Sequence, residues 1–317
     1  MANNVLVLGG TGFVGRAVCE QLVKRSVSAR IIVPTRRLPR GNAVRALPTV
    51  DLFEADIHDD AALRRLLGRA DAVVQLVGML HGSEAEFERV HVELPRRLAA
   101  ACAATGVQRV VHVSALAVAA DAPSRYLRSK AAGEAVLKAA PLALSVLRPS
   151  VMFGAEDRFM NRFAHLQLLA PLVPLAGADA RFQPVWVDEV AAAVVRCLDD
   201  KSSIGQTFEI AGPQVYTLSE LVRLAGRWSG RERPQLKLPD ALGRLQALML
   251  EWLPGEPLLS RDNLDSMKVA SVAGEQLPGL AALGITPTAL QAVAPFYLGQ
   301  HYGRARMERW RAVTRRA

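Results

Sequence analysis

The sequence predicts an α/β fold in which helices cover both faces of a doubly wound, parallel β-sheet. Short apolar runs alternate with amphipathic helical patterns over the first 150 residues, and a glycine-rich segment directly follows the first run. Strands buried on both faces appear as continuous apolar runs, and a helix after each strand makes neighbouring strands parallel. This alternation is typical of nucleotide-binding α/β folds.

The expected strands are six apolar runs, and the expected helices lie between them. The strands are predicted at residues 5–10, 29–35, 50–57, 72–78, 109–116 and 143–150. The helices are predicted at about residues 14–24, 61–67, 87–105 and 124–139. Together these elements form the first predicted domain, residues 1–150.

Beyond Ser150 the sequence changes character, because prolines and short apolar segments become dominant. We expect residues 151–317 to form a smaller, mostly helical C-terminal cap or substrate region. Segments 182–195 and 207–211 are expected to return to the main sheet, so the boundary is not a single cut.

The composition restricts the class of protein. Of 317 residues, 50% are hydrophobic and 22% are charged, which predicts a folded core and excludes a disordered chain. The net charge of +9 comes from 39 basic and 30 acidic residues, and only 6 of the basic residues are lysine. Before the C-terminus no dense basic block is interleaved with aromatic residues, so we expect no nucleic-acid partner.

Cysteines, histidines and the N-terminus give no sign of a metal site, a disulfide framework or a membrane span. Cys19, Cys102 and Cys197 are far apart, and His81 and His91 lack a third ligand at metal-binding spacing. The apolar start MANNVLVLGG reads as a strand, so we expect neither a signal peptide nor a transit peptide. No apolar stretch reaches the length of a membrane span. These features predict a cytoplasmic protein without a metal.

A GxxGxxG motif lies between the first expected strand and the first expected helix. Glycines at these positions permit a tight turn, a close approach of backbone to a pyrophosphate, and close helix–strand packing. The helix N-terminus then offers free N–H groups to phosphate. A turn required only for packing is the alternative interpretation. The residues expected to contact a dinucleotide here are Gly9, Thr11, Gly12, Phe13, Val14, Gly15 and Arg16.

The end of the second strand favours NADP(H) over NAD(H). About 20 residues after such a loop, an acidic residue would bind the ribose of NAD, whereas arginine accommodates the 2′-phosphate of NADP. Here Thr35 is followed by Arg36 and Arg37, with no acid nearby, and Arg16 offers a second cation. Asp56 is expected either to accept from the adenine amine or to cap the next turn. The predicted crevice is completed by Asp56, Ile57, Val77, Gly78, Lys130 and Pro149.

Tyr126 and Lys130 are four residues apart in the helix expected at residues 124–139, so they share a face. An ammonium group beside a phenol, with a cationic nicotinamide nearby, is expected to lower the pKa of the phenol toward the range that suits proton transfer. The spacing therefore predicts an acid/base pair.

The order of these motifs resembles the extended and atypical short-chain dehydrogenase/reductase family, whose members include NAD-dependent epimerases and dehydratases. GGTGFVG, YLRSK, LRPSVMFG, QPVWVDEVAAAV and TFEIAGPQVYTLSEL follow the order of that family. More narrowly, SRYLRSKAAGEAVLKAA and VMFGAEDRFMNRFA are similar to the nucleotide-binding accessory subunits of respiratory complex I and their bacterial relatives. The resemblance covers roughly residues 4–225 and implies a Rossmann-type fold.

The resemblance assigns roles to several residues. It implies that Tyr126 is the acid/base and that Lys130 holds the nicotinamide ribose. It also implies a substrate-orienting hydroxyl after the fifth strand, where Ser114 is the candidate, while Leu116 occupies the position that usually carries the hydroxyl. That departure argues against efficient turnover, because a carbonyl would be poorly positioned. A hydroxyl bonded only to the backbone is the alternative for Ser114.

Several weaker signals lie beyond the fifth strand. Arg148, Pro149 and Ser150 are expected to fix the exit of the last strand near the nicotinamide. Asp157, Arg158 and Phe159 are expected either at the start of a substrate groove or in a local turn with a salt bridge. The segment 303–317 holds six arginines and one glutamate. It is expected to be a solvated helix end or a contact with anionic lipid or an acidic partner.

Two functions follow from these expectations. The first is an NADP(H)-binding accessory or assembly factor of respiratory complex I or quinone metabolism, peripheral at the inner face of the energy-transducing membrane, with weak or no turnover. The second is an active NADP-dependent reductase, epimerase or dehydratase that uses Tyr126 and Lys130 on a sugar-nucleotide, quinone or isoprenoid-like substrate. Leu116 favours the first function, and the intact Tyr126–Lys130 pair favours the second.

Overall fold

The computed structural model describes residues 3–26, 30–252, 255 and 257–299. The chain divides into two compact units. The first unit combines Met1–Pro149 with two later segments, Val187–Ile210 and Ala273–Thr286. The second unit contains Ser150–Trp186, Ala211–Val272 and the rest of the chain from Pro287.

A seven-stranded, wholly parallel sheet forms the centre of the first unit, as the sequence predicts. Its strand order is β11-β6-β5-β4-β1-β2-β3. The direction of winding reverses between β1 and β4, and in such sheets ligands bind at the carboxyl ends of the strands near that reversal. The strands are β1 (Asn4–Leu8), β2 (Arg30–Thr35), β3 (Val50–Glu54), β4 (Ala72–Gln75), β5 (Arg109–Val113), β6 (Ala143–Pro149) and β11 (Thr207–Ile210).

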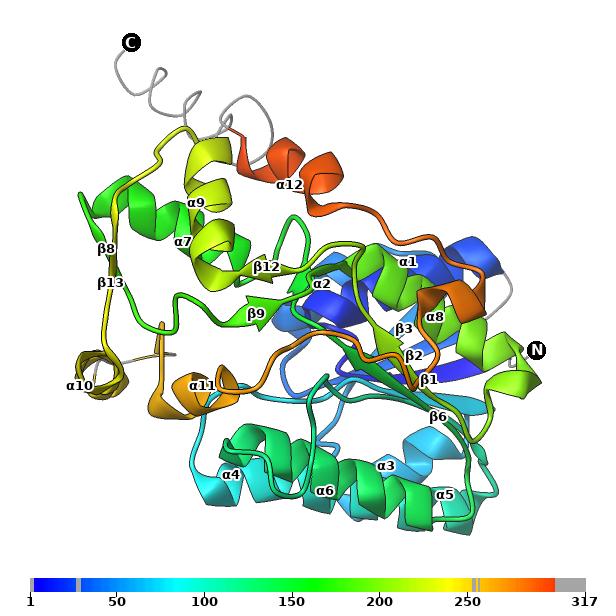
Figure 1. The fold of residues 1–317 in the computed structure, drawn as a ribbon. Coiled ribbons are helices and arrows are strands. Elements are labelled where there is room, and N and C mark those ends of the chain that lie inside the picture. The colour runs from blue at the N-terminus through cyan, green and yellow to red at the C-terminus, as the bar shows by residue number, and fades with distance from the viewer. Residues whose placement is uncertain (1–2, 27–29, 253–254, 256, 300–317) are drawn as a thin grey trace. The chain divides into compact units, whose positions relative to one another are not determined.

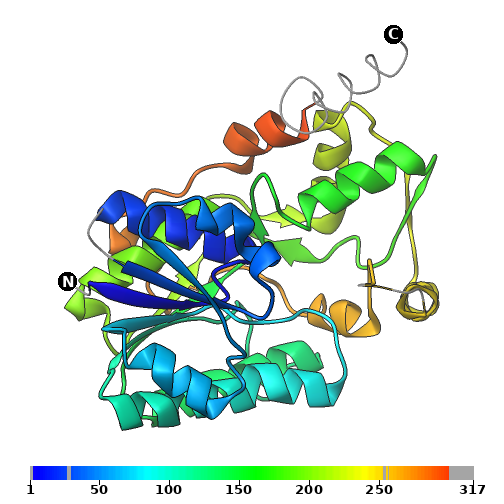
Figure 2. The same ribbon diagram turned by 180° about the vertical axis from the view of Figure 1, so that it is seen from behind.

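Helices cover both faces of this sheet (Figures 1 and 2). Helices α1 and α8 pack together on one face, whereas α3, α5 and α6 pack against one another on the other. Leucines from β1, α3, α5 and α6 fill the second interface and form a continuous buried core. The helices of this unit are α1 (Phe13–Arg25), α2 (Asn42–Arg45), α3 (Asp60–Leu67), α4 (Glu84–Glu88), α5 (Leu94–Thr105), α6 (Arg125–Ala139) and α8 (Val187–Asp199), with short 3₁₀ turns at Leu38–Gly41, Lys201–Ser203 and Leu280–Leu283.

The single helix expected at residues 87–105 is interrupted by a π-helical turn, Arg89–Glu93. Leu94 N–H bonds to the carbonyl of Arg89, five residues back. Pro95 has no N–H to offer the carbonyl of His91 four residues back, so a regular α-helical bond is missing at this point. The extra residue in the turn follows from that missing donor.

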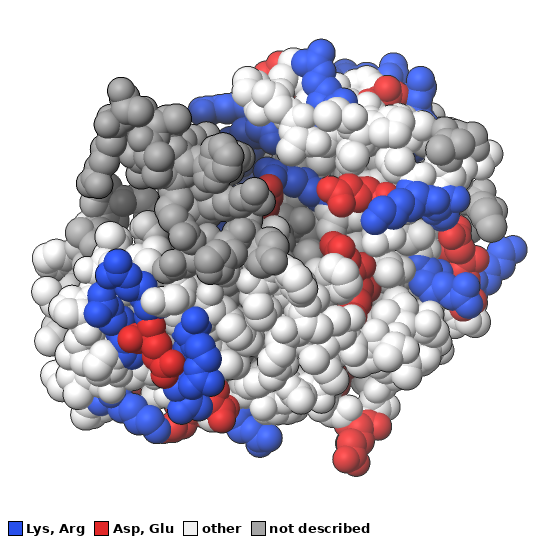
Figure 3. Space-filling view, turned by 90° about the horizontal axis from the view of Figure 1, so that it is seen from above, with Lys and Arg blue, Asp and Glu red and all other residues white. Residues whose placement is uncertain are grey.

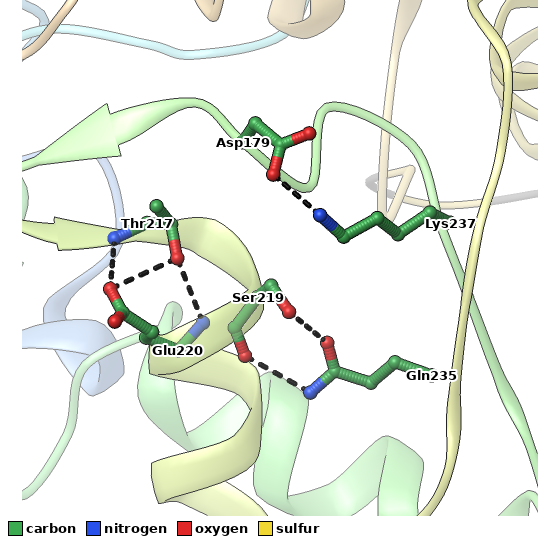
Figure 4. Close-up of polar contacts among 6 residues, drawn as sticks. All are labelled: Asp179, Thr217, Ser219, Glu220, Gln235 and Lys237. Carbon is green, nitrogen blue, oxygen red and sulfur yellow. Dashed lines mark hydrogen bonds and ion pairs between the residues drawn. The ribbon is translucent and has the colours of Figure 1, made fainter.

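The second unit is built from short strands and five helices within the described residues. Its two-stranded sheets pair β7 with β10, β9 with β12 and β8 with β13. Figure 4 shows Gln235 of β13 bonded to Ser219 at the start of α9, where Thr217 and Glu220 form a capping box. The elements are β7 (Met152–Phe153), α7 (Met160–Leu169), β8 (Val173–Leu175), β9 (Arg181–Phe182), β10 (Val185–Trp186), β12 (Tyr216–Thr217), α9 (Leu218–Trp228), β13 (Gln235–Lys237), α10 (Asp240–Glu251), α11 (Arg261–Ser266) and α12 (Leu290–Leu298).

The two segments expected to return to the main sheet behave differently. Thr207–Ile210 lies in it as the edge strand β11, parallel to β6. Segment 182–195 contributes no strand to it: β10 pairs with β7, and the following residues form α8 against α1. Only two residues of extended structure precede the amphipathic helix α8, and its first turn contains Asp188 and Glu189, which favour a helix start.

Charged side chains of both signs lie next to one another on the face shown in Figure 3, without a uniform basic field. None of the described helices combines the length and the apolar composition that a bilayer-spanning segment needs. The arginine-rich segment 303–317 lies outside the described residues.

Candidate functional site

The glycine motif forms a tight loop between β1 and α1. Gly9 has φ +85°, a left-handed conformation that favours glycine, and its carbonyl accepts from Gly12 N–H at 3.0 Å. A Cβ atom on Gly15 would lie 2.2 Å from the carbonyl oxygen of Gly9. The helix can approach the loop this closely only because position 15 has no side chain.

The beginning of α1 is suited to bind an anion. Gly12 is the N-cap and provides no side-chain cap, and the first turn contains no acidic residue. The N–H groups of the first turn therefore have no side-chain acceptor at the cap, and the helix dipole favours a negative charge there. Thr11, Phe13 and Val14 are each partly exposed around this end. The loop fits the pyrophosphate of a dinucleotide.

Arg36 and Arg37 directly follow β2, and both are exposed. Thr35 organises this end of the strand, because its Oγ1 donates to the carbonyl of Arg37 at 3.1 Å. Arg16 lies beside the glycine loop, where its Nε donates to the carbonyl of Thr11 at 3.3 Å. Its role as a second phosphate-binding cation stays a prediction.

Asp56 caps a turn, which was one of its two expected roles. It lies two residues beyond β3, and its Oδ1 accepts from the N–H of His58 at 3.0 Å. The imidazole of His58 has a lowered pKa because of burial and then because of nearby cations, Arg89 first, with Arg36 also contributing. The guanidinium groups of Arg36, Arg89 and Arg97 therefore lie near this imidazole, together with the carboxylate of Asp56. Sequence reasoning missed this group of charges because its members come from separate elements.

The exit of β4 lies against the glycine loop. The side chain of Val77 lies next to Gly9, and a Cβ atom placed on Gly9 would be 3.3 Å from it. Gly78 is exposed, and a Cβ atom placed on it would lie 3.6 Å from His91 Nε2 and 3.8 Å from Lys130 Nζ. The structure thus places Val77 against Gly9, and it places Gly78 near Lys130 and near His91, which the expected cofactor contacts did not include.

Tyr126 and Lys130 share one face of α6, which begins where Ser124 Oγ accepts from Leu127 N–H. Lys130 is buried, and its Nζ donates to the carbonyl of Val113 at the end of β5 at 2.9 Å. Burial lowers the pKa of Lys130 to about 8, although the nearby Glu134 opposes this shift.

In the chain by itself, burial dominates the pKa of Tyr126. The expected lowering involves a cationic nicotinamide beside the Tyr126–Lys130 pair and stays a prediction. Burial raises the pKa of Tyr126 to about 12. The loss of water around the phenol disfavours its charged form. A neutral phenol at physiological pH can donate a proton, but it is a poor base.

The exit of β5 carries Ser114, Leu116 and an unusual backbone conformation. Ser114 is buried, and its Oγ has no hydrogen-bond partner among the described residues. Leu116 is buried, and its N–H donates to the carbonyl of Pro149 at 3.0 Å. Ala117 has φ +59°, which is uncommon for a residue other than glycine and accumulates at functional sites. Sequence reasoning gave no signal for this strained position.

Asp157 and Phe159 belong to the interior of the second unit. Asp157 is buried and accepts from three backbone N–H groups, of Gly154, Phe159 and Asn161, and from the Tyr297 hydroxyl at 2.7 Å. Phe159 packs with Phe163 and Phe182. Ser150 donates to the carbonyl of Ser271 at 2.8 Å. The three backbone hydrogen bonds to Asp157 form the local turn that was one of the two expectations for this segment. The bonds to Tyr297 and Ser271 connect the segment to distant parts of the chain.

Metal-binding groups do not gather anywhere in the described parts of the chain. No set of three or more His, Cys, Asp or Glu side chains among them could hold a metal ion. His81 and His91 take part in no such set, and the three cysteines are buried and unpaired with one another.

Comparison with known proteins gives the family. A sequence model of the NAD-dependent epimerase/dehydratase family matches residues 5–211, which is more than half of the chain. A mouse relative, mitochondrial NADH dehydrogenase (ubiquinone) 1 alpha subcomplex subunit 9, is 32% identical over 315 residues, covering 96% of this chain and 81% of that protein. The chain therefore belongs to the NAD-dependent epimerase/dehydratase family, as its motifs indicated.

Two further comparisons concern a bacterial enzyme and a solved structure. A ceramide reductase of Caulobacter vibrioides is 29% identical, with 74% of each chain covered. The NADPH-dependent quinone oxidoreductase of Escherichia coli, solved with NADPH, superimposes with a TM-score of 0.73 at 20% identity, over 92% of this chain and 98% of that one. The second similarity shows the fold, a Rossmann-type α/β sheet.

Proposed function

We propose that this chain binds NADP(H) in its first unit and acts as an accessory or assembly factor of respiratory complex I or quinone metabolism, with weak or no turnover. The observation that carries the proposal is the glycine cradle at Gly9–Gly15 joined to a catalytic pair that lacks a well-placed third hydroxyl. The similarity to a subunit of a respiratory NADH dehydrogenase supports the choice of partner.

Different residues of the first unit would bind different parts of the dinucleotide. The backbone of Gly9, Gly12 and Gly15 and the start of α1 would hold the pyrophosphate. Arg36 and Arg37 would bind a 2′-phosphate through charge-assisted hydrogen bonds. Gly78 and Lys130 would border the nicotinamide ribose, with Thr35, Asp56, Ile57, Val77 and Pro149 along the rest of the crevice.

Weak turnover follows from the chemistry of the exit of β5. A reductase needs a proton donor and a group that orients the carbonyl beside the nicotinamide, which when bound would supply the hydride. Tyr126 is protonated at neutral pH and can serve as the donor. Leu116 offers no polar side-chain atom, and its backbone N–H already donates to the carbonyl of Pro149. Ser114 is then the sole side-chain hydroxyl proposed for the carbonyl.

The first experiment measures cofactor retention. Lys130→Ala should weaken NADPH binding about tenfold, because an ammonium contact to the ribose is lost. Tyr126→Phe should change it less than twofold, because the phenol is proposed to face the substrate. Fluorescence titration of NADPH gives both values. The reverse pattern, with loss of binding in Tyr126→Phe alone, would contradict the assignment.

The second experiment tests the nucleotide preference. Arg36→Asp should weaken NADPH binding by roughly tenfold and leave NADH binding nearly unchanged, since only NADPH carries the 2′-phosphate. Arg45→Asp is the matched control, because Arg45 is also an exposed arginine of the same unit, in α2. Equal affinity of the unaltered chain for both nucleotides would refute the preference and leave dinucleotide binding intact.

Ser114 favours one alternative, an active NADP-dependent reductase. Its buried Oγ has no partner among the described residues, as expected of a hydroxyl kept for a ligand. The similarity to a ceramide reductase points to lipid-like ketones beside quinones and sugar-nucleotides as substrates to try. Steady consumption of NADPH with one of these, abolished in Ser114→Ala and Tyr126→Phe, would replace the accessory function by this one.

A further inference from the structure

The π-helical turn Arg89–Glu93 points the ring of His91 between two parts of the proposed cofactor site. On one side, His91 Nε2 accepts from the N–H of Met79, in the loop that follows β4, at 3.1 Å. On the other side, Nδ1 lies 2.8 Å from Ser129 Oγ on α6. Ser129 Oγ in turn donates to the carbonyl of Tyr126 at 2.9 Å. One side chain therefore links the β4 loop to the helix that carries Tyr126 and Lys130.

These partners fix the protonation of the ring. Because Nε2 accepts a hydrogen bond from a backbone N–H, it carries no proton, and the neutral ring must carry its proton on Nδ1. Nδ1–H then donates to Ser129, whose own proton is directed to the Tyr126 carbonyl. Burial and the nearby Lys130 ammonium lower the pKa of His91 to about 3, which agrees with a neutral ring.

Two residues, Pro95 and Gly133, allow the turn that contains His91 to lie close to α6. Pro95 removes the N–H that would bond to the His91 carbonyl in a regular helix, and the turn widens there. That carbonyl lies against α6 at Gly133, where a Cβ atom would be only 1.7 Å from it. The proline and the glycine lie on different helices, and together they allow the turn to approach α6.

Ring contacts hold the imidazole on both sides. Phe87 stacks on it with centroids 5.5 Å apart, and Tyr126 meets it edge-on at 5.7 Å. Its Nε2 and Lys130 Nζ both border Gly78. The imidazole therefore lies beside Gly78 and Lys130, which are proposed to border the nicotinamide ribose. The loop proposed to hold the pyrophosphate, Gly9–Gly15, is a different one.

From this geometry we propose that His91 is a positioning residue for the nicotinamide half of the dinucleotide. It sets the β4 loop at Gly78–Met79 and the start of α6 at a fixed separation through its two hydrogen bonds. The proposal rests on the proposed function, because it assumes that a dinucleotide binds here.

The test compares a whole dinucleotide with its adenine half. NADPH and 2′,5′-ADP share the adenine and phosphate groups, and only NADPH has the nicotinamide half. If the unaltered chain prefers NADH, the pair is NADH and ADP. His91→Phe keeps an aromatic ring of similar size without either hydrogen bond. It should weaken NADPH binding roughly tenfold and change 2′,5′-ADP binding less than twofold.

Two conservative variants separate the two arms of the link. His91→Gln can place an amide oxygen near the position of Nε2 and keep the acceptor for Met79 N–H. His91→Asn can place an amide nitrogen near Nδ1 and keep only the donor to Ser129. Leaving the backbone N–H of Met79 without an acceptor costs more than losing the contact to the Ser129 hydroxyl. His91→Gln should therefore restore most of the NADPH affinity, and His91→Asn should restore less. If His91→Phe does not fold, this pair decides the question.

Each outcome has a distinct meaning. Selective loss of NADPH affinity with rescue by Gln supports the proposal. An equal loss for NADPH and 2′,5′-ADP shows a purely structural role, and no loss for either shows no role, so both overturn it. If the unaltered chain binds neither NADPH nor NADH, the proposed function itself fails, which the unaltered chain reveals before any variant is compared.

Discussion

Glu134→Gln should destabilise the first unit, and the loss should depend on pH in a definite direction. Glu134 lies on α6 one turn after Lys130, and its side chain is 3% exposed. Arg148 of β6 donates to it through Nε at 3.1 Å and Nη2 at 2.6 Å, and Lys138 Nζ lies 2.6 Å away. The pair anchors the helix that carries the proposed catalytic residues to the sheet.

The magnitude follows from the pKa of this carboxyl. Burial would raise the pKa of Glu134, but the hydrogen bonds from Arg148 and Lys138 outweigh it and lower the pKa from 4.5 to about 2. At about 1.4 kcal/mol per pKa unit, the charged form is stabilised by about 3 kcal/mol at neutral pH. Lys138 is 44% exposed and screened by solvent, so we expect Glu134→Gln to cost about 2 kcal/mol at pH 7.

The sign is fixed by the depressed pKa. The contribution is fully present above the unfolded value near 4.5 and is lost as the pH falls through the folded value near 2. The difference in unfolding free energy between the unaltered chain and Glu134→Gln should therefore fall to less than half by about pH 3. Glu88→Gln, at an exposed position of α4, is the control and should stay within about 0.5 kcal/mol.

Urea unfolding followed by circular dichroism and by tryptophan emission measures this difference. Trp186, Trp228 and Trp252 all lie in the second unit, so emission from these three follows that unit, whereas circular dichroism follows both. The variant should shift the circular dichroism transition. A gap below about 0.5 kcal/mol at pH 7, or a gap that stays constant down to pH 3, would refute the reasoning.

Two further predictions concern packing and docking. Gly133→Ala should destabilise the chain although alanine favours helices, because the new Cβ atom would lie 1.7 Å from the carbonyl oxygen of His91. Gly68→Ala is the control and should be tolerated, because its Cβ atom would meet no atom nearer than 3.5 Å. Thermal unfolding of both variants measures the difference. Co-sedimentation with vesicles tests peripheral membrane contact: the full chain should bind anionic vesicles more tightly than neutral ones, and a chain ending at Gly303 should lose most of that difference, since each arginine near an anionic surface contributes about 1 kcal/mol. Equal binding of both forms to both vesicles would rule out the contact.

The first unit was largely predictable because its signals are local. The run VLVL and the glycines that follow it specify a buried strand, a tight turn and a helix start, and the structure has β1, Gly9 at φ +85° and α1 in those places. The four-residue spacing of Tyr126 and Lys130 also requires only a helix. Periodicity and spacing are properties of neighbouring residues, so a single sequence contains them.

The second unit was less predictable because its strands are two or three residues long. A strand such as Arg181–Phe182 or Val185–Trp186 is too short to show an alternating pattern, and its partner comes from a distant segment. Exposed apolar residues of α10 and its C-cap repeat at helical spacing, namely Leu242, Leu245, Met249 and Trp252, and this pattern alone predicts a buried face. In the chain as described, Trp252 is 82% exposed. The pattern shows where an apolar face lies and leaves its partner undetermined.

The π-helical turn shows why the site itself was only partly predictable. Pro95 is a common residue at the start of a helix, and Gly133 lies within a helix where glycine has no local purpose. Each residue is explained only by the other, because the proline widens the turn and the glycine admits the displaced carbonyl. The hydrogen bond between His91 and Ser129 joins two helical segments that are 38 residues apart in the sequence. Such a contact produces no periodic pattern that a single sequence could show. The glycine in α6 is thus better read as a sign of close approach to another backbone than as a weak point of the helix.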